Sequence, residues 1–181
     1  CYGDGGALFT NNDDLANTIR GIVNHGMYKR YHHDVVGVNS RLDSIQASIL
    51  DIKLKLLDNY NSSRNKSARL YSENLKGNQN IILPSFKAEE KFHVFHQYTI
   101  RIINNKRDDL ANYLSESNIP FGIYYPIPLH RQKAYVDSRY NEDDFSNTNL
   151  LTQQVISLPM HSELEPDQIR FICEKINTFL K

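Results

Sequence analysis

The sequence has no excess of charge, no long apolar run and almost no cysteine. Basic residues number 21 and acidic residues number 21, so bulk charge provides no surface for nucleic acid or an anionic membrane. No apolar run approaches the roughly 20 residues that a membrane helix needs, and no secretory signal peptide is recognisable. The two cysteines, Cys1 and Cys173, lie at opposite ends without metal-binding spacing. We therefore expect a reduced, cytoplasmic setting.

Self-contained catalytic motifs are also missing from the sequence. It contains no Gly-x-Ser-x-Gly turn, no His-Glu-x-x-His helix and no phosphate loop ending in Gly-Lys-Ser/Thr. His32, His33 and Asp34 are consecutive, but adjacent side chains diverge and no further ligand is suitably spaced, so we predict no metal site. The chain begins without methionine and reads as a segment of a longer protein.

What is present predicts an α+β fold. The chain has 181 residues, 40% of them hydrophobic, which is enough to bury a sizeable core. Apolar spacing, capping residues and β-branched runs predict the following elements: helices over 13–25, 106–118, 144–154 and 166–180, and strands over 5–10, 81–84, 94–103, 119–123 and 155–159. This order indicates a small sheet with helices on one side, preceded by a remnant of a larger α/β domain.

Between these parts the sequence predicts one long connecting helix. Apolar residues recur at helical spacing from Leu42 to Leu75, and no proline interrupts them. Such a helix, with a bend near residues 59–63, would span roughly 50 Å and bridge two parts of a protein or two subunits. We accordingly divide the chain into an interface segment and domain remnant (1–41), the connecting helix (42–78) and a small C-terminal domain (79–181).

Two residues precede that helix in a way that suggests an anion site. Asn39 and Arg41 lie where a polar loop becomes helical, and a helix start offers free N–H groups together with the positive end of its dipole. The alternative is that Ser40 is only an N-cap and Arg41 only a solvated residue. The preceding segment 27–38 is long for a loop without structure of its own and is rich in aromatic and cationic residues, which favours a functional role.

A second candidate region follows the predicted strand 119–123. Pro126 and Pro128 hold the backbone extended and so fix how Tyr124, Tyr125 and His130 are presented. Two tyrosines and a histidine on a rigid turn are typical of a ligand-binding wall. Packing of the tyrosines and a structural histidine is the equally weighted alternative.

Five motifs, in this order and at familiar separations, resemble one known family. They occupy residues 1–7, 24–26, 37–47, 125–132 and 157–161. Together they are similar to the C-terminal half of sugar-nucleotide aminotransferases of the DegT/StrS type, which are pyridoxal-phosphate (PLP) enzymes of the aspartate-aminotransferase fold. The resemblance covers essentially the whole chain.

The resemblance implies a homodimer with shared active sites. Asn39, in the G-x-N-x-R motif, would reach the cofactor phosphate of the neighbouring subunit, with Arg41 beside the same anion. Ser40 stands where many relatives carry an aromatic residue, so any stacking contact there is not expected. The loop 27–38 would lie at the dimer interface.

The resemblance also implies a substrate-binding set and a missing catalytic group. His130, Tyr124, Tyr125 and His25 would bind the nucleotide sugar. The Schiff-base lysine would lie upstream of Cys1, so no catalytic residue is expected in this chain and the fragment alone should be inactive. The whole enzyme would move an amino group, commonly from glutamate, onto a keto-sugar nucleotide. The residues of the motifs at 37–43 and 125–130 favour a product that is a 3-amino sugar for surface polysaccharide.

Two other functions stay open at this point. A PLP-dependent sugar dehydratase of the same family would differ mainly at the lysine position, which lies outside this sequence. A non-catalytic domain that kept the fold for binding or dimerisation would need no lysine.

Overall fold

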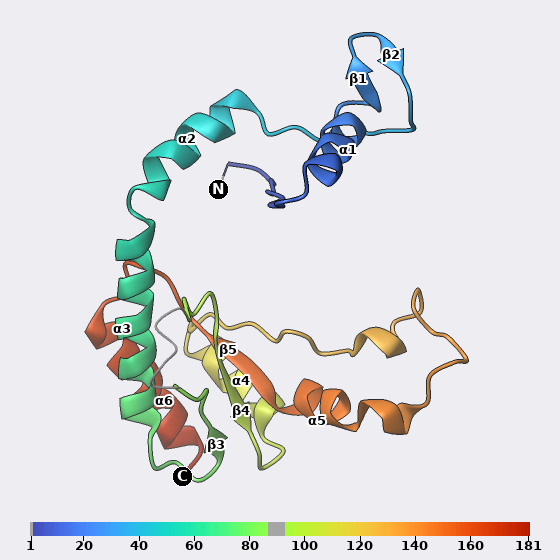
Figure 1. The fold of residues 1–181 in the computed structure, drawn as a ribbon. Coiled ribbons are helices and arrows are strands. Elements are labelled where there is room, and N and C mark those ends of the chain that lie inside the picture. The colour runs from blue at the N-terminus through green and yellow to red at the C-terminus, as the bar shows by residue number, and fades with distance from the viewer. Residues whose placement is uncertain (1, 87–92) are drawn as a thin grey trace. The chain divides into compact units, whose positions relative to one another are not determined.

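The computed structural model describes residues 2–86 and 93–181, which form two compact units, Cys1–Leu57 and Asp58–Lys181 (Figure 1). In the described part of the chain no helix combines the length and apolar character needed to cross a membrane.

The first unit contains two helices and a small hairpin. Helix α1 (Asp13–Val23) begins where predicted, because the Asn12 side chain accepts a hydrogen bond from the Leu15 amide (2.9 Å). Strands β1 (Met27–Lys29) and β2 (His32–His33) pair antiparallel, and helix α2 spans Ser44–Leu54. The strand predicted over 5–10 is wrong, since these residues are irregular. A strand needs a hydrogen-bonded neighbour, and the described residues provide none for this segment.

The connecting helix predicted over 42–78 is not continuous, and it is interrupted before the bend expected at 59–63. Helix α2 ends at Leu54, a turn contains Lys55 and Leu56, and helix α3 (Leu57–Leu75) follows. The two helices differ in burial: α3 buries Ala68, Tyr71 and Leu75, whereas α2 buries no residue. Apolar residues continue at helical spacing across the turn, so the sequence pattern does not show that one helix ends and another begins there. The functional division into 1–41, 42–78 and 79–181 stays a prediction.

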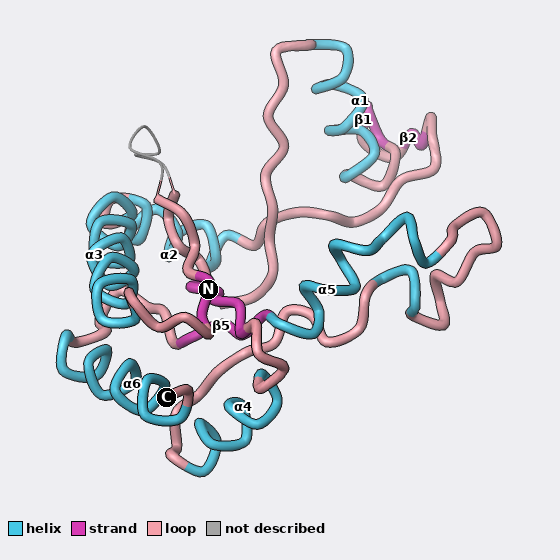
Figure 2. The backbone as a smooth tube through the Cα atoms, turned by 90° about the horizontal axis from the view of Figure 1, so that it is seen from below, coloured by secondary structure: helices cyan, strands magenta, loops and turns pink. Residues whose placement is uncertain are grey.

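The second unit is built on a three-stranded antiparallel sheet in the order β3-β4-β5. Its strands are β3 (Ile81–Ile82), β4 (Tyr98–Ile102) and β5 (Val155–Leu158). Helices α3, α4 (Arg107–Glu116) and α6 (Pro166–Phe179) lie around one side of this sheet (Figure 2). The predicted α+β class is confirmed. The predicted strand over 119–123 is reduced to one bridge between Gly122 and Ser157.

A long excursion connects α4 to β5. It contains the short 3₁₀ helices η1 (Leu129–Arg131) and η2 (Glu142–Phe145), followed by helix α5 (Ser146–Gln154). The helix predicted over 144–154 thus begins as a 3₁₀ turn.

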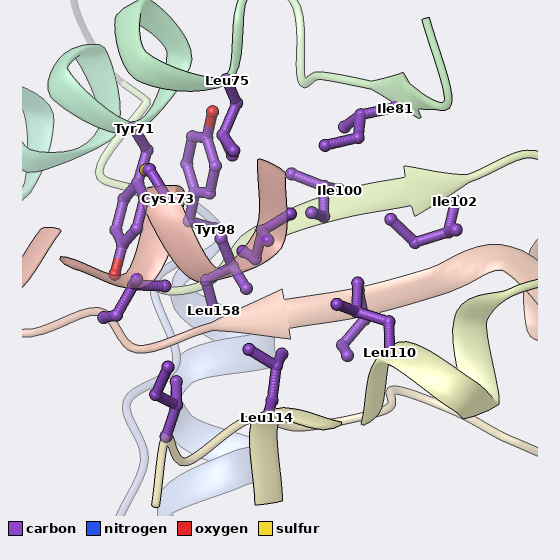
Figure 3. Packing of buried hydrophobic residues seen from close by; sticks show 14 of the residues in the cluster. Tyr71, Leu75, Ile81, Tyr98, Ile100, Ile102, Leu110, Leu114, Leu158 and Cys173 are labelled. Carbon is purple, nitrogen blue, oxygen red and sulfur yellow. The ribbon is translucent and has the colours of Figure 1, made fainter. Parts of the chain in front are cut away.

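Aromatic and aliphatic side chains from the helices and the sheet form the core of the second unit (Figure 3). Tyr71 of α3 stacks on Tyr98 of β4 with ring centroids 4.9 Å apart, and the hydroxyls of Tyr98 and Ser72 are 2.6 Å apart. Burial raises the pKa of the Cys173 thiol to about 12, so this cysteine acts as a small apolar group.

Truncation of Leu114 tests whether this core supports the second unit. Leu114 of α4 is fully buried in the cluster drawn in Figure 3. We expect Leu114→Ala to lower the free energy of unfolding by about 2–5 kcal/mol, through lost burial and the cavity left behind. Leu151→Ala, at a partly exposed site on α5, is the control and should change it by less than about 1 kcal/mol. Equal losses in urea unfolding would contradict the assignment of this core.

Candidate functional site

The first candidate region is a close backbone junction at the end of α1. Gly26 and Gly37 face each other: a Cβ on Gly37 would lie 2.0 Å from the Gly26 nitrogen, and a Cβ on Gly26 would lie 1.7 Å from the Val35 carbonyl oxygen. Gly26 also has a φ of 77°, which favours glycine. Only glycines allow the two chain segments to approach this closely.

Hydrogen bonds at this junction attach the segment carrying Asn39 to the end of α1. The Val38 amide donates to the Ile22 carbonyl (2.8 Å) and the Ser40 amide to the Val23 carbonyl (2.9 Å). Asn39 itself forms a backbone bridge with Asn24. The backbone of Asn39 is therefore fixed from both sides, while its side chain is exposed.

Asn39 and Arg41 are brought together by a direct hydrogen bond. Arg41 Nε donates to Asn39 Oδ1 at 2.9 Å. With its oxygen occupied, Asn39 presents its amide N–H groups, and Arg41 keeps its remaining guanidinium donors. The pair is thus a set of hydrogen-bond donors with one positive charge, which suits an acceptor-only anion such as a phosphate.

The helix-start part of the prediction is wrong. Helix α2 begins at Ser44 with Asp43 as its N-cap, so Ser40 is not a cap and the first amides of α2 are not adjacent to Asn39 in sequence. Asp43 itself makes no side-chain capping hydrogen bond. The donor character of the region comes from two side chains and not from a helix terminus.

The segment 27–38, which is long for a loop without structure of its own, contains a hairpin. In this β1–β2 hairpin, Arg30 lies over the Tyr31 ring at 4.8 Å. His33 donates from Nδ1 to the carbonyl of His25 (2.9 Å), and His25 adopts a φ of 61°. His25 is thereby fixed at the base of the hairpin through its backbone. Among residues 2–86 and 93–181, no group of three or more His, Cys, Asp or Glu side chains could hold a metal ion.

The second candidate region lies in the second unit and is attached to its sheet. Gly122 and Ser157 exchange two backbone hydrogen bonds of 2.7 and 3.0 Å. The Tyr124 ring folds back over Gly122, where a Cβ would lie 2.5 Å from ring carbon Cζ. Tyr124 and Tyr125, joined by a cis peptide bond, keep 48% and 72% of their surface exposed. The backbone is docked, whereas both phenol rings are accessible to a ligand.

His130 is held in place from two directions. Its imidazole stacks on the Phe145 ring with centroids 4.2 Å apart and planes within 15°, and its Nε2 lies 3.3 Å from Glu142 Oε2. Only 11% of the side-chain surface of His130 is exposed. The structure does not place His130 with Tyr124 or Tyr125 through any hydrogen bond or ring contact in the described residues.

Glu142 and Phe145 are the residues that sequence reasoning missed. Glu142 accepts from Arg131 Nε (2.9 Å) and Nη2 (2.7 Å) as well as contacting His130. The Arg131 guanidinium lowers the pKa of Glu142 to about 2, so the carboxylate is charged at neutral pH. No sequence pattern indicated the pairing, since both residues lie more than ten positions from His130 in an irregular segment.

Comparison with known proteins identifies the family. The model of the DegT/DnrJ/EryC1/StrS aminotransferase family matches residues 1–177. This chain belongs to that family. The resemblance inferred from the five motifs is confirmed.

Relatives within this aminotransferase family cover nearly all of the chain. It is 42% identical over 173 residues (96% of the chain) to UDP-2-acetamido-2-deoxy-3-oxo-D-glucuronate aminotransferase of Pseudomonas aeruginosa. It is 40% identical over 178 residues (98% of the chain) to UDP-N-acetyl-3-dehydro-alpha-D-glucosamine 3-aminotransferase of Acidithiobacillus ferrooxidans. The matched parts are 46% and 47% of those proteins, so the chain spans about half the length of these curated relatives.

Solved structures of this aminotransferase family show the same fold. A family member from Brucella abortus matches with a TM-score of 0.90 at 37% identity, over 99% of this chain and 47% of that one. S. venezuelae DesV, solved with a ketimine intermediate, matches with a TM-score of 0.87 at 32% identity, over 95% of this chain and 46% of that one.

Filling the glycine junction should disturb the segment that carries Asn39. We expect Gly37→Ala to reduce the protection of the Val38 and Ser40 amides against hydrogen exchange by roughly 1–3 kcal/mol, because the new methyl group clashes with backbone atoms that cannot move aside. Gly6→Ala is the matched control, since nothing lies within 4 Å of its Cβ position. Unchanged protection in Gly37→Ala would refute the role of this contact.

Proposed function

We propose that the complete protein containing this chain is a PLP-dependent aminotransferase that transfers an amino group, from glutamate, to a keto-sugar nucleotide. The observation that carries this proposal is the identity of 40–42%, over nearly the whole chain, to two aminotransferases whose named substrates are 3-oxo or 3-dehydro UDP-sugars. These names favour amination at carbon 3, as the motif wording did, and a role in polysaccharide or amino-sugar biosynthesis.

The donors at Asn39 and Arg41 fit the phosphate of such a cofactor. The phosphate accepts hydrogen bonds only, and the pair offers amide and guanidinium donors on an exposed surface. In the proposed homodimer these two residues hold the phosphate in the partner's site. The cofactor, when bound, supplies the electron sink for moving the amino group.

The nucleotide sugar is proposed to bind at residues of the second unit. His130, Tyr124 and Tyr125 offer a fixed imidazole and two exposed phenols, which can hydrogen-bond hydroxyl and phosphate groups. His25, which lies in the first unit, is retained as a proposed substrate residue on the resemblance alone. These residues bind and orient the substrate, and none of them replaces the lysine that the chemistry needs.

The chain of residues 1–181 is proposed to be catalytically incomplete. No lysine in it lies in a motif that matches the Schiff-base lysine of the family. We expect PLP added to the purified chain to produce no Schiff-base absorbance beyond that of nonspecific surface lysines. A stoichiometric, saturable band would contradict this and would favour a second lysine site.

The sugar-dehydratase alternative is decided by the residue upstream of Cys1. A histidine at the lysine position would favour the dehydratase, and a lysine would favour the aminotransferase. A non-catalytic binding or dimerisation domain would be favoured if the complete protein bound no PLP.

Removal of the Asn39 side chain tests both the activity and the phosphate role. In the complete protein we expect glutamate-dependent amination of a UDP-3-keto sugar, with PLP retained. Asn39→Ala should weaken PLP binding by about 1–3 kcal/mol, because a donor to a charged group is lost. Asn11→Ala, at an exposed position before α1, should leave PLP binding unchanged. Wild-type PLP affinity in Asn39→Ala would sink the phosphate role, and absence of amination in the wild type would sink the proposed function.

A further inference from the structure

One carboxylate, that of Glu142, receives hydrogen bonds from two segments of the excursion, η1 and α5. From η1 it receives Arg131 Nε and Nη2 (2.9 and 2.7 Å) and lies 3.3 Å from His130 Nε2. From α5 it receives Asn149 Nδ2 (2.9 Å), which also reaches the Glu142 carbonyl (3.3 Å). Glu142 therefore ties η1 to the start of α5.

The other charged contact in this excursion does not do this. Asp137 accepts from Arg139 Nε and Nη2 (3.0 and 2.7 Å), two residues along the chain. That ion pair is local, and within the described residues its two side chains form no hydrogen bond to another segment. Both are arginine–carboxylate ion pairs. They differ because Glu142 also hydrogen-bonds to a second segment, whereas Asp137 does not in the part of the chain that the structure describes.

The contacts around His130 fix both the position of its ring and the nitrogen that carries the proton. Phe145 covers one face of the imidazole and Glu142 meets its Nε2 edge. An ionised carboxylate only accepts hydrogen bonds, so Nε2 carries a proton in this contact. In the neutral ring Nδ1 is then the acceptor, and no group in residues 2–86 or 93–181 hydrogen-bonds to it.

We infer that Glu142 is a positioning residue that fixes the orientation and tautomer of His130, so that His130 Nδ1 accepts a hydrogen bond from a hydroxyl group of the nucleotide sugar. This inference rests on the proposed function for the identity of the ligand. The arrangement of Glu142, Phe145 and His130 stands without it. Glu142 acts through His130 and does not touch the substrate.

The kinetic test uses the complete enzyme and compares Glu142→Gln with Asp137→Asn. Glutamine keeps the shape of the side chain, but its amide both donates and accepts, so it no longer dictates which nitrogen of His130 carries the proton. We expect KM for the keto-sugar nucleotide to rise roughly tenfold in Glu142→Gln, with kcat and KM for glutamate nearly unchanged. Asp137→Asn should match the wild type, and Glu142→Asp, which keeps an acceptor-only group, should lie between.

A double substitution tests whether Glu142 affects substrate binding only through His130 or also through other groups. His130→Asn should raise the same KM, and adding Glu142→Gln in that background should cause no further rise, because Glu142 acts through the missing imidazole. A wild-type KM in Glu142→Gln, or effects that multiply in the double variant, would overturn the inference.

The tautomer gives a readout that needs no turnover. The complete protein is labelled with ¹⁵N-histidine for NMR, and the His130→Asn variant assigns the His130 signals. In the wild type, neutral His130 should carry its proton on Nε2. In Glu142→Gln, the two tautomers of His130 should both be populated. A proton on Nδ1 in the wild type would overturn the inference. If the wild type aminated no keto-sugar nucleotide, the proposed function would fail, and this measurement alone would decide whether Glu142 positions His130.

Discussion

The second unit depends on the pairing of β4 with β5. Their register, Tyr98 with Leu158 through Arg101 with Val155, directs Tyr98, Ile100 and Ile102 into the core. The same strand β5 receives Gly122 through Ser157, and Gly122 in turn leaves room for the Tyr124 ring. A shift of one residue in this pairing would reverse every side chain of β4 and displace Gly122, which lies within the excursion between α4 and β5. The candidate substrate residues Tyr124 and Tyr125 are therefore positioned by the sheet, although neither lies in a strand.

Features with a local cause could be predicted from the sequence. Asn12 caps α1 through its own side chain, and α6 begins at Pro166 after a capping box formed by Glu165 and Gln168. Both depend on residues three positions apart. The strand expected over 5–10 failed because a strand is completed by a neighbour, which the residue pattern does not supply. The same limit applies to the segment 119–123, where only Gly122 finds a partner, in Ser157. The break after Leu54 has a different cause, because apolar residues continue at helical spacing across the turn.

The candidate sites divide in the same way. Short motifs indicated Asn39, Arg41 and His130, because closely spaced polar residues can be read directly. No sequence pattern marks Glu142, because acidic residues are common in irregular polar segments. Its importance comes from a three-dimensional contact between η1 and η2, and only there do Arg131 and His130 meet one carboxylate. Side-chain contacts between residues distant in the chain could not be predicted from the sequence alone.

The spacing of Asn39 and Arg41 has a physical reason that the structure makes visible. Residues two apart in an extended segment project to the same side, whereas the residue between them projects to the other. The hydrogen bond from Arg41 Nε to Asn39 Oδ1 places these two side chains together, and the junction of Gly26 with Gly37 holds the segment from behind. An extended segment fixed through its backbone explains the G-x-N-x-R spacing better than the helix terminus that the sequence first suggested.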